Sequence, residues 1–145
     1  MPAKPVLLDT GPLAALFSRA DRDHARAKRF FESCDRPFVS TEAVVTDLAC
    51  LLSDSVRLQS LALEWVDVAR RHGRLEVAAV ADHVALARTM QRYADLPCDY
   101  ADATLIALAD ALGTRDIATL DERAFSIYRL KGNRGFHLVF GADKT

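Results

Sequence analysis

Residues 6–12, Val-Leu-Leu-Asp-Thr-Gly-Pro, join a short apolar run to an aspartate and then to the start of a helix. The run from Val6 to Leu8 predicts a buried strand. Pro12 suits the first turn of a helix, because its φ is already helical and its missing N–H would have no partner there. A strand that passes directly into a helix is the building unit of α/β folds. We therefore predict an α/β protein whose first strand ends at Asp9.

The same alternation of apolar runs and helical patterns continues along the chain. Further helices are predicted over 21–34, from an N-cap at Ser40 or Thr41 to Leu52, and over 58–71, 82–93 and 100–112; further strands are predicted over 38–39, 75–80, 117–119 and 137–140, with a turn at 125–128. No repeat, low-complexity tract or Pro/Gly/Ser linker interrupts this order. Residues 1–145 are therefore predicted to form a single domain, with a five-stranded, largely parallel sheet between helices.

The composition is that of one soluble globular domain. Of the 145 residues, 50% are hydrophobic and 27% are charged. A chain of this length can bury a core without disulfides or a structural metal, so any metal is expected to be functional. The 19 basic and 20 acidic residues give a formal net charge of −1. This excludes the broad basic excess of a non-specific nucleic-acid binder, so contact with nucleic acid would be local.

The cysteines and histidines indicate neither disulfides nor zinc. The 3 cysteines form no CxxC pair, and an odd number fits no internal disulfide set. The 4 histidines lie apart, without zinc-ligand spacing. The first ten residues show no export signal, and no apolar stretch approaches the roughly 20 residues needed to span a bilayer. We expect a cytoplasmic protein.

Two aspartates follow predicted strands. Asp9 comes directly after the first strand, and Asp121 follows the strand at 117–119. Ligands of open parallel sheets bind beyond the carboxyl ends of the strands. The alternative for each aspartate is a cap of the next helix.

Two further aspartates lie on the apolar sides of predicted helices. Asp102 precedes Leu105 and Ile106 by three and four residues, so its carboxylate shares their face. Asp47 lies between Val44 and Leu51 at helical spacing, where the alternative is a surface residue at the margin of the apolar stripe. No lysine or arginine lies within a turn of these aspartates or of Asp9.

These acids need a partner if they converge. Two unit charges about 4 Å apart repel by roughly 4 kcal/mol at an effective dielectric constant of 20. A divalent cation removes this repulsion, and an all-oxygen ligand set favours Mg²⁺ or Mn²⁺.

Four other residues have both a functional and a structural interpretation. Asp99 is either a further metal ligand or an N-cap after Pro97. Glu42 competes with Asp47 as the second acidic residue, but a helix dipole alone explains an acid at that place. Thr10 and Thr119 neighbour key aspartates and can bond a carboxylate or a water, or can serve as a helix cap and a strand residue.

Four segments, LLDTGPLAAL, TEAVVTDLACLL, DYADATLIALAD and ATLD, together resemble the PIN-domain family, most closely the VapC toxins of type II toxin–antitoxin pairs. The resemblance implies a three-layer α/β/α sandwich and a metal-dependent endoribonuclease. Asp9, Asp102 and Asp121 match the family's aspartates, and Thr10 and Thr119 its hydroxyl positions. Asp47 departs from the pattern, because the family usually has glutamate there.

The resemblance also implies the roles of these acids. They would hold one or two Mg²⁺ or Mn²⁺ ions that activate water and stabilise the leaving oxygen. Asp9 and Asp102 would be metal ligands, Asp121 would serve a second metal or the attacking water, and Asp47 would act as a ligand or general base.

The implied partners are RNA, an antitoxin and a second copy of the chain. RNA needs positive charge near the acids, for which Arg22, Arg115 and Arg123 are candidates; a solvated helix face is the alternative for each. Single-stranded or looped RNA is expected, because its bases are accessible. The antitoxin would cover the acidic groove. Its contacts and those of a homodimer would use apolar residues such as Phe17, Phe31 and Trp65, unless these are core.

Three other functions are alternatives to a ribonuclease. A haloacid dehalogenase phosphatase needs a second aspartate where Gly11 stands, and a receiver domain needs an acidic pair after the first strand. Both are disfavoured. A PIN-like module that binds RNA or protein without catalysis remains the alternative, with metal serving stability alone.

Overall fold

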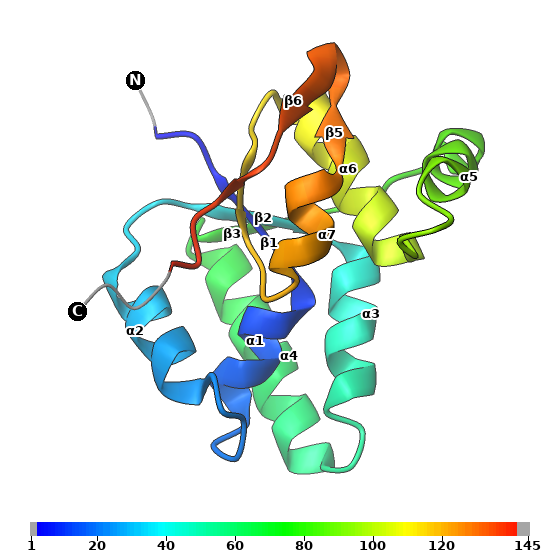
Figure 1. Ribbon diagram of the computed structural model, residues 1–145. Coiled ribbons are helices and arrows are strands. Elements are labelled where there is room, and N and C mark those ends of the chain that lie inside the picture. The colour runs from blue at the N-terminus through cyan, green and yellow to red at the C-terminus, as the bar shows by residue number, and fades with distance from the viewer. Residues whose placement is uncertain (1–2, 142–145) are drawn as a thin grey trace.

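The computed structural model describes residues 3–141 (Figure 1). Residues 1–2 and 142–145, which the predicted domain includes, lie outside the described residues. The central sheet has five strands in the order β3-β2-β1-β4-β7, and each neighbouring pair is parallel. Its strands are β1 (Val6–Leu8), β2 (Phe38–Thr41), β3 (Leu75–Ala78), β4 (Asp116–Ala118) and β7 (His137–Leu138). The predicted five-stranded parallel sheet is confirmed.

Helices cover both faces of this sheet. They are α1 (Thr10–Phe17), α2 (His24–Ser33), α3 (Glu42–Leu51), α4 (Val56–Arg71), α5 (His83–Arg92), α6 (Tyr100–Leu112) and α7 (Glu122–Ile127). Successive residues of β1 point to opposite faces, so Leu7 enters one core cluster while Val6 and Leu8 enter the other. One cluster includes α5, α6 and α7, and the other α1, α2 and α4. These are the two outer layers in Figure 1. Within the described residues, no helix is long and apolar enough to cross a membrane.

The strand order fixes where a ligand would bind. From β1 the chain moves outward through β2 to β3, then returns to the other side of β1 as β4 and β7. The order therefore reverses between β1 and β4, which pair at Leu7 with Ile117 and at Leu8 with Ala118. A switch point of this kind opens a crevice at the carboxyl ends of the two strands.

Two elements differ from the sequence prediction. The turn predicted at 125–128 is part of α7, which begins at Glu122 after the N-cap Asp121. A two-stranded antiparallel sheet of β5 (Arg129–Leu130) and β6 (Arg134–Gly135), joined by the 3-10 turn Lys131–Asn133, was not predicted. Both elements are too short to show a hydrophobic period.

The buried face of α4 is also shifted by one residue from the predicted stripe. In the helix predicted over 58–71, the spacing of Leu61, Trp65 and Val68 predicts that these three form its apolar stripe. Leu61 and Val68 are instead exposed, while Ala62, Val66 and Ala69 are buried. Small side chains let the helix approach the sheet closely, and the larger neighbours are left outside. Leu51 of α3, expected in the stripe of its helix, is 63% exposed.

The three aromatic residues considered for protein contacts are partly buried. Trp65 packs edge-on against Phe17 and Phe31, with ring centroids 6.2 and 5.7 Å apart. They line a groove of about 920 Å³ between α1, α2 and α4, together with Leu16, Leu58 and Leu61. The side chains therefore contribute both to the core and to an apolar groove.

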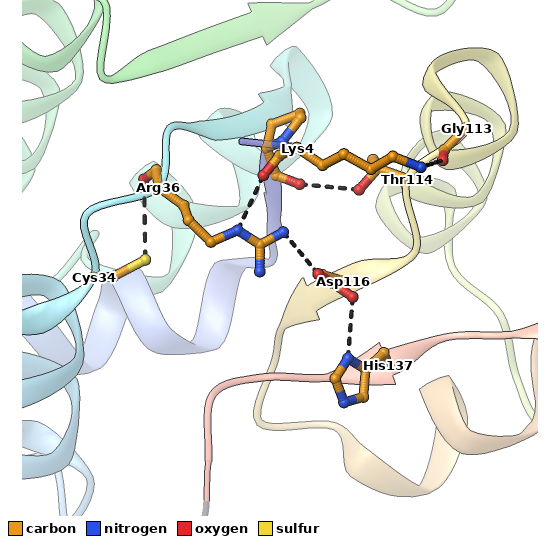
Figure 2. A network of polar contacts seen from close by, with 8 residues as sticks. Lys4, Cys34, Arg36, Gly113, Thr114, Asp116 and His137 are labelled. Atoms are coloured by element: carbon orange, nitrogen blue, oxygen red, sulfur yellow. Dashed lines mark hydrogen bonds and ion pairs between the residues drawn. The ribbon is translucent and has the colours of Figure 1, made fainter. Parts of the chain in front are cut away.

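A polar network ties together the amino ends of the strands, opposite the end where β1 meets Asp9 (Figure 2). Arg36, just before β2, donates from Nη2 to Asp116 Oδ2 at 2.7 Å and from Nε to the Lys4 carbonyl at 3.0 Å. His137 Nδ1 of β7 lies 3.1 Å from Asp116 Oδ1. Partial burial works to raise the pKa of Asp116, but the hydrogen bonds and charges of Arg36 and His137 outweigh it and hold the pKa below its usual range.

Replacing Asp116 with asparagine is expected to lower the free energy of unfolding by about 1–2 kcal/mol at pH 7, because it removes a charged acceptor shared by two strands. The pKa of Asp116 is lowered in the folded protein. Its contribution to stability is therefore fully present above the pKa of the unfolded chain and is lost as the pH falls through the pKa of the folded protein. Urea denaturation measures the change. Asp67→Asn is the matched control, because Asp67 pairs with Arg71 on an exposed helix face; its effect is expected within about 0.5 kcal/mol. An equal effect of both variants would refute this role for the network.

Candidate metal centre and active site

Asp9 lies buried at the switch point, between β1 and α1. Its backbone N–H donates to the Ala118 carbonyl at 3.0 Å, which joins it to the end of β4. Thr119 Oγ1 donates to Asp9 Oδ2 at 2.7 Å. Burial raises the pKa of Asp9 to about 6 against the hydrogen bonds from Thr119 and the Thr10 backbone, and the charges of Asp99 and Asp121 add to the rise. The side chain makes no cap bond to α1, so the alternative of a helix cap is not realised.

Asp102 reaches the same site from the first turn of α6. It is 9% exposed, as is Asp9. The Tyr128 hydroxyl donates to Asp102 Oδ2 at 2.7 Å. Burial raises the pKa of Asp102 to about 7 against this hydrogen bond, and the charges of Asp9, Asp99 and Asp121 add to the rise. Asp9 and Asp102 are thus both buried, and the charge of Asp9 acts on Asp102.

Asp99 and Asp121 border the site and cap the helices that enter it. Asp99 Oδ1 accepts from the Asp102 backbone N–H at 2.8 Å, so the cap interpretation of Asp99 is confirmed. Asp121 Oδ1 accepts from the Ala124 N–H at 3.2 Å at the start of α7. The Asp121 N–H also donates to Thr119 Oγ1 at 3.0 Å. Thr119 thus links Asp121 to Asp9.

The Gly11 backbone lies close to the side chain of Leu120. A Cβ on Gly11 would lie 3.1 Å from Leu120 Cβ and Cδ1, tighter than ordinary van der Waals contact. The first turn of α1 can therefore pack directly against the segment between Thr119 and Asp121. Asp9 and Asp121 share one end of the sheet because β1 and β4 are parallel neighbours, and Gly11 leaves room for Leu120 between them.

The structure distinguishes Asp47 from Glu42. Asp47 is half-buried on α3, and burial raises its pKa, with a further contribution from the charge of Asp99. Glu42 is exposed at the first position of α3. Asp47 is therefore partly buried, as its helical spacing predicted, and it lies within electrostatic reach of Asp99.

Thr10 is the one described residue with a buried side-chain polar atom that lacks a hydrogen-bond partner. Thr10 is 7% exposed, and its buried Oγ1 has no hydrogen-bond partner. An unpaired buried hydroxyl is costly, and it lies next to Asp9 in the chain. A water or other ligand at the site would satisfy it.

The chemistry of these residues fits a hard cation. Within residues 3–141, none of the ion pairs involves Asp9 or Asp102. Burial and mutual repulsion therefore oppose their negative charge, and only hydrogen bonds, with no basic side chain, work against that effect. No three described acidic, histidine or cysteine side chains stand close enough together to hold a metal ion as they lie. Asp99 and Asp121 each have one oxygen engaged at a helix N-terminus, so side-chain rotation would be needed to complete a ligand set.

The three candidate arginines lie at different distances from the acids. Arg123 is exposed in the first turn of α7, two residues after Asp121. Arg22 lies beyond the far end of α1 and pairs with Asp23 at 3.7 Å. Arg115 immediately precedes Asp116 at the amino end of β4. Of these three arginines, only Arg123 is close in sequence to a carboxylate of the candidate site, Asp121.

Sequence reasoning missed Tyr128, which contacts Asp102 directly. The hydroxyl belongs to the residue that ends α7, 26 positions after Asp102. Burial and the hydrogen bond to Asp102 both raise the pKa of Tyr128, so the hydroxyl remains a proton donor. No sequence pattern marks this pairing, because the residue resembles an ordinary core aromatic beside Phe125.

Comparisons with known proteins show the family and the fold of the chain. The family model described as "PIN domain" matches residues 6–131. Ribonuclease VapC26 of Mycobacterium tuberculosis is 31% identical over 134 residues, covering 92% of this chain and 99% of that protein. The crystal structure of Mycobacterium tuberculosis VapC20, described as a sarcin-ricin loop cleaving toxin, superposes with a TM-score of 0.69 at 22% sequence identity, over 81% of this chain and 90% of that chain. The VapC20 likeness confirms the three-layer α/β/α fold.

Proposed function

The chain belongs to the PIN-domain family, and from this premise we propose that it is a metal-dependent endoribonuclease and the toxin of a type II toxin–antitoxin pair. The ribonuclease name of its 31% identical relative supports the activity. The reaction is hydrolysis of RNA phosphodiester bonds.

One observation in the structure carries the proposal. Asp9 and Asp102 are buried together at the strand-order switch point, their pKa values are raised to about 6 and 7, and no described basic side chain neutralises them. A protein that needed only a packed core would gain stability from apolar residues at these places. Perturbed carboxylates in a crevice are a sign of catalysis or metal binding.

Asp9 and Asp102 would hold Mg²⁺ or Mn²⁺, with Asp121 and Asp47 completing the set directly or through water. When bound, such an ion lowers the pKa of water and stabilises charge on the phosphate and leaving oxygen. Thr119 and Tyr128 each hold one carboxylate oxygen in place. The Thr10 hydroxyl is available to a water, and exposed Arg123 to an RNA phosphate. No side chain needs to act as a nucleophile.

Asp47 is proposed as the acid that takes the place of the family's usual glutamate. Asp47→Asn is expected to lower the initial rate of Mn²⁺-dependent cleavage of a mixed single-stranded RNA pool by about 10- to 100-fold, because the half-buried carboxylate orients a ligand or water. Glu42→Gln on the same helix is the matched control, and its rate is expected within about twofold of wild type. A larger loss in Glu42→Gln than in Asp47→Asn would transfer the role to Glu42.

The proposed partners are RNA and a cognate antitoxin, in the cytoplasm. The groove of Phe17, Phe31 and Trp65 is also lined by three basic residues, Arg19, Lys28 and Arg57, and by one acidic residue, Glu32. Such a surface suits an amphipathic antitoxin segment with acidic side chains. The homodimer implied by the family resemblance stays a prediction.

A further inference from the structure

The hydroxyl of Tyr128 is fixed in position by the packing of its ring. Tyr128 is 0% exposed. The ring lies edge-on against Phe125, with centroids 5.0 Å apart, and against Tyr93, with centroids 4.9 Å apart. A close-packed aromatic side chain of this kind has a single rotamer available.

The backbone at Tyr128 is held as firmly as the ring. Arg129 Nη1 donates to the carbonyls of Ser126, Ile127 and Tyr128 at 2.9, 3.1 and 2.9 Å. The Arg129 N–H donates to the Tyr93 hydroxyl at 2.8 Å. Arg129 thereby closes the carboxyl end of α7, where its unpaired carbonyls need donors. The Tyr128 hydroxyl is thus a rigid reference point for whatever it contacts.

That contact is with one oxygen of Asp102. The Tyr128 hydroxyl donates to Oδ2 at 2.7 Å, and Oδ1 has no hydrogen-bond partner among the described residues. The buried Asp9 has a similar arrangement, since Thr119 donates to its Oδ2 at 2.7 Å. One hydroxyl therefore holds each carboxylate, Thr119 for Asp9 and Tyr128 for Asp102.

The charges around Asp102 explain why it needs to be held. Asp9, Asp99 and Asp121 all act on its carboxylate with the same sign. Repulsion would turn an unrestrained carboxylate away from these three residues. Binding of a cation would then have to reorder the Asp102 side chain, which costs part of the binding free energy.

We propose that Tyr128 is a positioning residue that orients Asp102 for metal binding. By holding Oδ2, its hydroxyl leaves Oδ1 as the oxygen free to bind a cation. The inference rests on the proposed function, because it takes Asp102 to be a metal ligand. Outer contacts that orient ligating side chains commonly change metal affinity or activity by about 10- to 100-fold when they are removed.

The test is Tyr128→Phe, which removes one oxygen atom and keeps the ring. Mn²⁺ is added to the metal-stripped intact protein, and the unbound ion is followed by electron paramagnetic resonance. We expect the Mn²⁺ dissociation constant to rise by about 10- to 100-fold. Cleavage of a mixed RNA pool should fall at low Mn²⁺ and recover toward the wild-type rate as Mn²⁺ is raised, because the defect lies in ligand orientation.

Tyr93→Phe is the matched control. It removes the same atom from the neighbouring ring, where the hydroxyl bonds the backbone of Arg129 and no carboxylate. Its Mn²⁺ dissociation constant is expected within about twofold of wild type, whatever its stability in urea. If Tyr93→Phe weakened Mn²⁺ binding as much as Tyr128→Phe, the effect would be one of packing and the inference would be overturned.

The outcomes separate this inference from the proposed function. Wild-type affinity for Mn²⁺ in folded Tyr128→Phe, alongside wild-type protein that binds Mn²⁺ and cleaves RNA, overturns the inference alone. Wild-type protein that neither binds Mn²⁺ nor cleaves RNA overturns both. Should Tyr128→Phe fold poorly, the titrations of wild type and both variants are repeated in sucrose, which favours the folded state, and the same weakened binding of Tyr128→Phe is expected.

Discussion

Asp102→Asn is expected to lower the rate of RNA cleavage by on the order of 10³-fold and to make the metal-free protein more stable at pH 7.5. The loss reflects a metal ligand, whose contribution to stabilising charge in the transition state is several kcal/mol. The gain in the free energy of unfolding should be about 2–4 kcal/mol, because asparagine carries no charge for burial to oppose. The amide oxygen of asparagine can still accept the hydrogen bond from Tyr128.

Initial cleavage rates and urea denaturation in EDTA measure the two effects on the same preparations. Asp95→Asn is the control, because Asp95 is exposed in the turn between α5 and α6. It should leave both quantities near the wild-type values. If Asp102→Asn cleaved RNA at the wild-type rate, Asp102 would not be a catalytic carboxylate. If the variant were less stable than wild type, the buried charge of Asp102 would not be destabilising.

The metal-free protein is expected to lose about 3–4 kcal/mol of its free energy of unfolding between pH 5 and pH 7.5. The pKa values of Asp9 and Asp102 are raised to about 6 and 7 by burial, above the 3.8 of an unperturbed aspartate. In this window the folded protein binds more protons than the unfolded chain. Stability is therefore fully present below the unfolded pKa and is lost as the pH rises through the folded pKa values.

Saturating Mn²⁺ should remove most of this loss, because the cation favours the ionised carboxylates. Urea denaturation at both pH values, with EDTA and with Mn²⁺, measures the four free energies. The Asp9→Asn/Asp102→Asn double variant should show little dependence on pH in this range. Asp116 does not interfere, because its lowered pKa acts at lower pH and with the opposite sign. A metal-free wild-type protein that became more stable from pH 5 to pH 7.5 would contradict the prediction.

The sheet and the long helices could be predicted because their local signals agree with the tertiary structure. Helix α6 was predicted with its observed bounds, since Asp99 caps its start and Gly113 ends it with a φ of 67°. Helix α7 was missed because six residues show no period, and its stability comes from the Asp121 cap and the burial of Phe125. The α4 face was misassigned because alanines, which allow close packing, carry little weight in a hydrophobic pattern.

The candidate site could be predicted where a charged residue lies in an apolar stretch of sequence. Asp102 stood out as a carboxylate on an apolar helix face, and it is buried there. Asp9 stood out at the end of a strand. Tyr128 carried no such contradiction, since a buried tyrosine is ordinary in a core. Its role depends on the hydroxyl contact with Asp102, which only the fold creates.

The most direct test of the proposed ribonuclease is cleavage of a mixed RNA pool by metal-stripped protein, freed of any bound partner, with and without Mn²⁺. Asp102→Asn is assayed beside it at equal folded concentration. We predict that the RNA is cut only when both Mn²⁺ and Asp102 are present, and the cut sites would then begin to define the target. Folded wild-type protein that binds Mn²⁺ and leaves the pool intact would contradict the ribonuclease and favour a PIN-like binding module in which metal serves stability.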